Sequence, residues 1–219
     1  MLFNIVCTIA FCHFLLIGRV LAQTPTTTVP AFSRCTSPCP TETPVGQPDP
    51  RFVCGDNRLG PVDLPSEPPI AEMLGGYEQF GGLCPRDYFY HWFSDINQHY
   101  INPPGNGFLL DAYNRSMYTE VTIPVGTLLD RFGGLNASYL SILGTDYVRR
   151  SISPGNLSRR NSTTAAIYYV FNVTQPIPAQ YGRSAPWYGQ PGGELQYYLP
   201  NSSTQILIDQ GSLELIESL

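Results

Sequence analysis

The stretch APWYGQPGGELQYYL, residues 185–199, combines a turn-rich segment with a strand. Alternation along GELQYYL places Glu194, Gln196 and Tyr198 on one face of that strand. The preceding Gly and Pro residues suit a turn that joins two buried strands. The same stretch is rich in aromatic and amide side chains, which would also suit a binding site. The rest of the chain decides between these two interpretations.

Short strands are predicted on the N-terminal side of this stretch, at FLLDAY (108–113), MYTEVTI (117–123) and AAIYYVFNV (165–173). A helix is predicted over residues 84–96, with Pro85 at an early position. A second, short helix is capped by Ser203 and Thr204, runs through Ile208 and ends at Gly211 in a left-handed conformation. This content predicts an α+β fold dominated by an antiparallel sheet.

The strand at residues 165–173 alternates, and Asn172 lies in a glycosylation sequon that should face solvent. That parity turns Tyr168 and Val170 outward as well. The inward set is then Ile167, Tyr169, Phe171 and Val173.

The N-terminus predicts export. Met1 to Ile17 is almost wholly apolar, and Val20-Leu21-Ala22 provides a small-residue cleavage site, so residues 1–22 are interpreted as a signal peptide. The run is short for a membrane span. Residues 23–50 form a Pro- and Thr-rich leader, residues 51–105 a Cys-linked region with the aromatic helix, and residues 106–219 the main domain.

Cysteines and sequons support an extracellular location. After cleavage four cysteines remain, which predicts two disulfides with three possible pairings. They are Cys35, Cys39, Cys54 and Cys84. Six sequons predict glycosylation. Their acceptors are Asn114, Asn136, Asn156, Asn161, Asn172 and Asn201.

Composition excludes several chemistries. Every basic residue is Arg and no Lys is present, so Schiff-base and P-loop mechanisms are excluded. The formal net charge of −5 and the absence of a basic stripe argue against nucleic-acid binding. The mature chain has only His91 and His99 and no G-x-S-x-G motif, which disfavours serine hydrolases. The disulfides would consume the Cys ligands of a zinc site, so no metal site is predicted.

Arg, aromatic and Gly residues gather instead in DRFGG (130–134), SYL (138–140) and YVRRS (147–151), as well as in the opening stretch. A planar guanidinium grips phosphate in a bidentate manner, and aromatic rings hold a planar base. This combination suits a ligand that carries both phosphate and rings. The alternative assigns the aromatic residues to the core and the Arg residues to surface ion pairs.

Five motifs in order resemble NAD glycohydrolases with a tuberculosis-necrotizing-toxin (TNT) domain. They are IPVGTLLDRFGG, SYLSILG, YVRRS, APWYGQPGGELQYYL and LIDQGSL. The elements VCGDNRLGPV, FGGLCP and INPPGNGF resemble the fungal secreted, spore-surface members. The resemblance implies a compact antiparallel-sheet domain related in outline to ADP-ribosyltransferases. It also implies a disulfide-stapled N-terminal extension, at residues 51–105, that forms a homodimer.

The resemblance implies cleavage of the nicotinamide–ribose bond of NAD, and of NADP, to give ADP-ribose and nicotinamide, with no cofactor. Gln196 and Arg131 would be catalytic, and Arg131 and Arg150 would contact the phosphates of the dinucleotide. Phe132 and Tyr139 would wall the nicotinamide and its ribose. The further binding residues would be Trp187, Gly193 and Glu194.

Glu194 departs from the family pattern, and E-x-Q on one strand face leaves transferase or cyclase activity open. Two other functions also fit the sequence. One is a non-catalytic secreted surface glycoprotein. The other is a glycosidase that acts on cell-wall sugars through paired carboxylates.

Overall fold

A computed structural model describes residues 35–36, 38–41, 47–94, 99–158 and 167–219. The predicted signal peptide, most of the Pro/Thr-rich leader and the sequon at Asn161 lie outside these residues.

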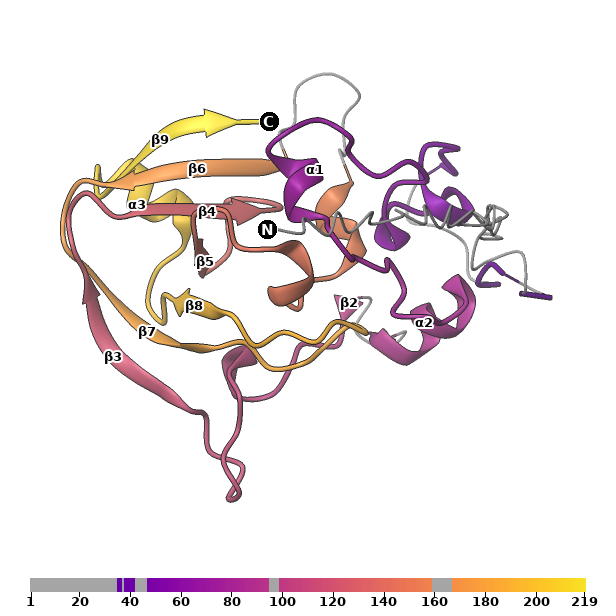
Figure 1. Cartoon of the computed structure of the whole chain (residues 1–219), viewed down its shortest axis with the longest axis horizontal. Coiled ribbons are helices and arrows are strands. Elements are labelled where there is room, and N and C mark those ends of the chain that lie inside the picture. The colour runs from indigo at the N-terminus through magenta and orange to yellow at the C-terminus, as the bar shows by residue number, and fades with distance from the viewer. Residues whose placement is uncertain (1–34, 37, 42–46, 95–98, 159–166) are drawn as a thin grey trace, which may run out of the picture.

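The described residues form one seven-stranded sheet in the order β3-β7-β8-β5-β4-β6-β9 (Figure 1). Every neighbouring pair is antiparallel. The strand bounds are β3 Tyr118–Ile123, β4 Leu128–Phe132, β5 Tyr139–Ile142, β6 Tyr168–Val173, β7 Ile177–Arg183, β8 Leu195–Tyr198 and β9 Leu213–Ser218. The predicted α+β class and its antiparallel sheet are confirmed. Because β8 lies between β7 and β5, residues 185–199 supply a central strand of the sheet.

Helices are few and short: α1 spans Ile70–Met73, α2 spans Pro85–Trp92 and α3 spans Thr204–Asp209. The predicted cap of α3 is confirmed, since the side chain of Ser203 accepts a hydrogen bond from the Ile206 amide. Gly211 has the predicted left-handed conformation, with a φ of 71°. The remaining elements are β1 Phe93–Ser94, β2 His99–Tyr100 and the 3₁₀ turns Val53–Gly55, Asn57–Leu59, Gly105–Gly107, Tyr147–Arg149 and Pro154–Leu157.

Two predicted elements differ from the structure. The helix predicted over residues 84–96 ends at Trp92, because Phe93 is extended and pairs with Tyr100 in a two-stranded ribbon. Residues 108–113 do not form a strand. Phe108 and Leu110 make only isolated bridges, to Ser184 and Ser116 respectively.

The predicted facing of β6 is wrong for two residues. Ile167, Phe171 and Val173 are buried as predicted, but Tyr168 is 1% and Val170 is 6% exposed. Both pack with Ile70 and Met73 of the N-terminal region on the second face of the sheet. Strict alternation assumes one solvated face, whereas β6 is covered on both faces.

The N-terminal region packs directly on the main domain. One apolar cluster joins α1 and Tyr77 to Phe132, Tyr147 and Tyr168 of the main domain. Another joins Tyr88 and Phe89 of α2 to Tyr188. Hydrophobic contacts therefore cross the predicted boundary at residue 105.

Two disulfides hold the start of this region, as Cys35–Cys84 and Cys39–Cys54. Disulfides of this kind form in oxidising compartments. None of the helices within the described ranges has the length and apolar character of a membrane span.

Candidate active site

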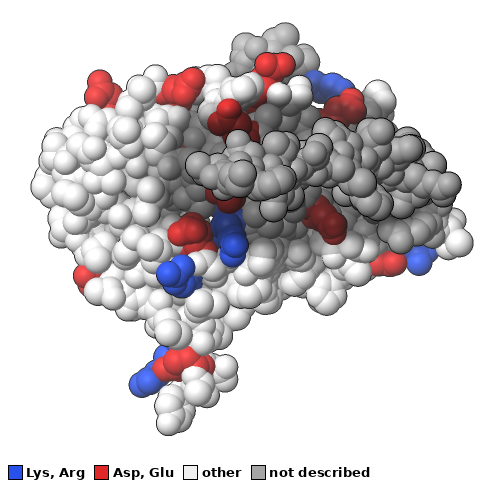
Figure 2. Space-filling view, in the orientation of Figure 1, with Lys and Arg blue, Asp and Glu red and all other residues white. Residues whose placement is uncertain are grey.

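A cleft of about 420 Å³ opens over the middle of the sheet. Strands β4, β5 and β8 form its floor, and two further segments, residues 100–107 and 150–156, form walls. Five of the eight predicted catalytic and binding residues line it: Arg131, Phe132, Tyr139, Arg150 and Gln196. Figure 2 shows basic and acidic side chains next to one another near the middle of the drawn face.

Three polar residues of the floor form a row across neighbouring strands. Gln196 of β8 pairs in register with Ser141 of β5, which pairs with Asp130 of β4. Register partners on adjacent antiparallel strands project from the same face of the sheet. Gln196, Ser141 and Asp130 therefore share the face that lines the cleft.

The amide of Gln196 has a defined orientation. Its Nε2 donates to the carbonyl of Gly107 over 3.0 Å. A carbonyl can only accept, so this contact fixes which end of the amide carries the nitrogen. The Oε1 atom has no hydrogen-bond partner among the described residues, and it is free to accept from a ligand hydroxyl or water.

Arg131 lies where β4 and β5 separate. Its Nε donates to the Gly134 carbonyl over 2.7 Å and its Nη1 to the Tyr139 carbonyl over 2.6 Å. Within the described part of the chain Arg131 has no carboxylate partner. Burial lowers its pKa to about 10, so the guanidinium stays protonated at neutral pH. A partly buried cation without a counter-ion is available to an anionic ligand.

Arg150 lines the cleft but is held in an ion pair, and its predicted role as a phosphate ligand stays a prediction. It is 7% exposed, and its Nη1 and Nη2 donate to the two oxygens of Asp130 over 2.5 and 2.9 Å. Its Nε and Nη2 also donate to the Thr145 carbonyl. Asp130, fully buried, accepts two further bonds, from the Gly144 amide and the Tyr168 hydroxyl. Arg150 thus holds the wall of the cleft rather than presenting a free guanidinium.

The two predicted aromatic residues differ in exposure. Tyr139 is 36% exposed and packs its ring 5.0 Å from that of Tyr198. Phe132 is 3% exposed and packs in the core, with Arg150 over its ring at 5.0 Å. Tyr139 is therefore the ring more available to a ligand.

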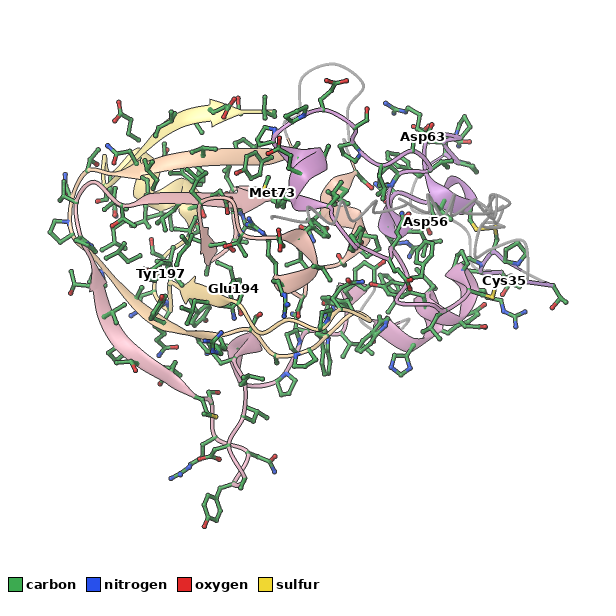
Figure 3. All side chains as sticks on the ribbon, in the orientation of Figure 1. Cys35, Asp56, Asp63, Met73, Glu194 and Tyr197 are labelled. Atoms are coloured by element: carbon green, nitrogen blue, oxygen red, sulfur yellow. A yellow bond between two sulfur atoms is a disulfide. The ribbon has the colours of Figure 1, made fainter. Side chains whose placement is uncertain are left out.

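Trp187, Gly193 and Glu194 do not line the cleft, contrary to prediction. Trp187 packs on Trp92 and donates from Nε1 to the Ile101 carbonyl. Glu194 lies just before β8, where its Oε1 accepts from the Leu195 amide (Figure 3). The two adjacent glycines differ in the space around them: a Cβ at Gly192 would lie 2.6 Å from Ser151 Oγ, whereas one at Gly193 would lie 3.9 Å from Arg149 Nη1. All three residues precede β8, and the sequence pattern could not show where the cleft ends.

The structure adds residues that sequence reasoning missed. They are Tyr100, Asn102, Pro103, Asn106, Gly107, Ala137, Ser141, Ser151, Ile152, Ser153, Asn156 and Tyr188. Two of these residues lie in motifs of the sequence: Asn106 in INPPGNGF and Ser151 in YVRRS. Asn106 and Ser151 have positive φ angles of 54° and 52°, which are uncommon for residues other than Gly and cluster at functional sites.

Comparison with known proteins gives a family match over the strands that form the floor of the cleft. The family model described as tuberculosis necrotizing toxin matches residues 122–216, a range that holds β4 to β8, the end of β3 and most of β9. The chain is 39% identical over 168 residues to the conidial surface nicotinamide adenine dinucleotide glycohydrolase nadA of Aspergillus fumigatus. This alignment covers 76% of the chain and 71% of that relative.

Two solved structures are also similar. Tuberculosis necrotizing toxin in complex with its immunity factor IFT has 23% identity and a TM-score of 0.43, covering 58% of this chain and 68% of that one. Rhs1-CT in complex with its cognate immunity protein RhsI1 has 12% identity and a TM-score of 0.35, covering 53% and 84%. On its family match and its curated relative, the chain belongs to the TNT-domain family that includes the Aspergillus conidial surface NAD glycohydrolase.

Proposed function

We propose that the protein is a secreted NAD glycohydrolase that cleaves the nicotinamide–ribose bond of NAD, giving ADP-ribose and nicotinamide. The proposal rests on two residues that line the same cleft, Gln196 and Arg131. Gln196 has a free Oε1, and Arg131 has no counter-ion among the described residues. The relationship to a curated NAD glycohydrolase supports it.

The chemistry fits the groups present. Nicotinamide is a pyridinium in NAD and leaves as a neutral ring, so its departure needs no proton from a general acid. The site must bind the dinucleotide, exclude water from the cation and stabilise an oxocarbenium-like ribose. Gln196 Oε1 would accept from a ribose hydroxyl or from the attacking water.

Arg131 would bind the anionic half of the substrate. Two of its nitrogens are fixed on backbone carbonyls, which holds the planar guanidinium at the junction of β4 and β5. A preorganised donor loses little conformational entropy on binding. Tyr139 would pack against the nicotinamide or its ribose, as its exposure allows.

The structure argues against the glycosidase alternative. A glycosidase of the usual type needs two carboxylates that face the scissile bond. Among the described residues that line the cleft, Asp130 is the only carboxylate, and it is fully buried in its pair with Arg150. The cleft does not offer the second carboxyl group.

The direct experiment is to incubate the purified mature chain with NAD and measure free nicotinamide by chromatography. Nicotinamide and ADP-ribose in equal amounts are the expected result. NADP should be cleaved in the same assay, and cyclic ADP-ribose measures any cyclase activity. A folded protein that leaves NAD intact would favour the non-catalytic surface glycoprotein.

Arg131→Lys should lower kcat/KM for NAD about 10- to 100-fold, because a single ammonium cannot replace a guanidinium held on the Gly134 and Tyr139 carbonyls. Steady-state kinetics with the melting temperature measured in parallel check this. Arg115→Lys is the matched control, since Arg115 is exposed and pairs with Asp111 outside the cleft. Wild-type kinetics in Arg131→Lys would remove Arg131 from the site.

Residues 51–105 should also mediate a homodimer, as the resemblance to the fungal members implies. Light scattering at micromolar concentration should give twice the mass of the mature chain. A monomer at that concentration would contradict the dimer and leave the catalytic proposal standing.

Secretion and glycosylation complete the proposal. A signal peptide at residues 1–22 would direct the chain to the exterior or the cell surface. Asn114, Asn136 and Asn201 are exposed and suit glycan attachment. Asn156 lines the cleft, and its Nδ2 donates to the carbonyl and hydroxyl of Ser153. A glycan on Asn156 would fill the cleft, so catalysis requires that this sequon is unmodified.

A further inference from the structure

The wall formed by residues 150–152 contains hydrogen-bond donors that the protein does not use. Ser151 is 7% exposed, and its buried Oγ has no partner. The amides of Ser151 and Ile152 likewise donate to no acceptor among the described residues. Buried polar groups are nearly always paired, so the unpaired Oγ of Ser151 requires an explanation, and two unused amides lie beside it. Both residues line the cleft.

The backbone at this turn has the conformation of an anion-binding nest. Arg150 is right-handed, with φ −88° and ψ −16°, and Ser151 is left-handed, with φ 52°. A right-handed residue followed by a left-handed one turns successive amides toward a common concavity. A left-handed conformation costs a Ser residue free energy, and it persists only where the surrounding structure enforces it. The turn is therefore held in a shape that serves a ligand.

The surroundings carry the charge that an anion needs. Arg131, which lines the same cleft, has no carboxylate partner in the described part of the chain. Asp130 is neutralised by its ion pair with Arg150. No other described carboxylate lines the cleft to repel an anion.

We infer that the turn at residues 150–152 binds a phosphate oxygen of the dinucleotide. The Ser151 and Ile152 amides supply two donors, and the Ser151 hydroxyl supplies a third after rotation about χ1. In the structure as it stands this hydroxyl lies against Gly192, where a Cβ would come within 2.6 Å of Oγ. The inference rests on the proposed function and replaces Arg150 with backbone donors as the phosphate ligand.

Affinity for ADP-ribose and for inorganic pyrophosphate, measured by calorimetry on the mature chain, tests the hydroxyl. Ser151→Ala should weaken ADP-ribose binding about tenfold or more, since a hydrogen bond to a charged group is lost. Ser151→Gly, which removes the hydroxyl and accepts the left-handed backbone, should give a similar loss and serves if Ser151→Ala does not fold. Ser184→Ala is the matched control: Ser184 is also buried, but it does not line the cleft and its Oγ donates to the Arg149 carbonyl.

Amide resonances test the backbone donors. In an NMR titration of the wild-type chain with pyrophosphate, the Ser151 and Ile152 amides should shift and saturate at the calorimetric dissociation constant. Nicotinamide riboside, which lacks phosphate, should leave these two resonances in place.

The outcomes separate this inference from the proposed function. Unshifted Ser151 and Ile152 amides, or wild-type ADP-ribose affinity in both folded Ser151 variants, would overturn the nest even in an active NAD glycohydrolase. Binding that depends on Ser151, in a protein that does not cleave NAD, would support the nest and reject the enzyme.

Discussion

Gln196→Ala should reduce kcat for NAD about 100- to 1000-fold, the loss typical of removing one transition-state contact. The amide is held by the Gly107 carbonyl with Oε1 unpaired, so the variant loses the acceptor that faces the ribose. KM should change much less than kcat, because the phosphate and aromatic contacts remain. Single-turnover measurement of nicotinamide release separates the chemical step from product release.

Two variants sharpen the interpretation. Gln196→Glu keeps the acceptor oxygen but cannot donate to Gly107 when ionised, so it tests whether orientation or the acceptor itself matters. Gln205→Ala is the control, since Gln205 lies on α3 and bonds Asp209 at the surface. Turnover within threefold of wild type in Gln196→Ala would place the catalytic contact on another residue.

Asp130→Ala should be the most destabilising single change in the cleft. It leaves the 7%-exposed Arg150 guanidinium without its carboxylate, and breaking a buried pair in this way costs about 3–5 kcal/mol. For a chain of this size that corresponds to a melting temperature lower by roughly 6–20 °C. Calorimetry or circular dichroism on the purified variant measures it.

A double variant distinguishes a structural pair from a phosphate ligand. Arg150→Met should also destabilise, and Asp130→Ala with Arg150→Met together should recover part of the stability, because no buried charge remains unpaired. If Arg150 instead bound phosphate, Arg150→Met would reduce NAD affinity while its melting temperature stayed near that of wild type.

The sequence predicted three of the seven strands of the sheet, β3, β6 and β8, because these strands carry local signals. The alternation of GELQYYL and MYTEVTI depends on residues within each segment, and both became strands. The facing of Tyr168 and Val170 could not be predicted from alternation. It depends on Ile70 and Met73, which lie about one hundred positions earlier in the chain.

The difference between local signals and contacts from distant segments also explains which cleft residues could be predicted. DRFGG, SYL, YVRRS and residues 185–199 contain eight of its lining residues, five of which were predicted as site residues. Arg150 was assigned to phosphate because a sequence shows a guanidinium but not its partner. That partner is Asp130 of β4, and only the fold brings the two residues together. The unused donors at Ser151 depend on backbone angles, which a residue type alone does not give.

The first disulfide has a consequence for where the support behind the cleft is available. Cys84, which bonds Cys35, directly precedes α2, whose Tyr88 and Phe89 pack in one cluster with Tyr188 of the cleft. Such bridges form and persist in oxidising compartments and not in the reducing cytosol. The covalent anchor of α2 therefore belongs to the chain outside the cell.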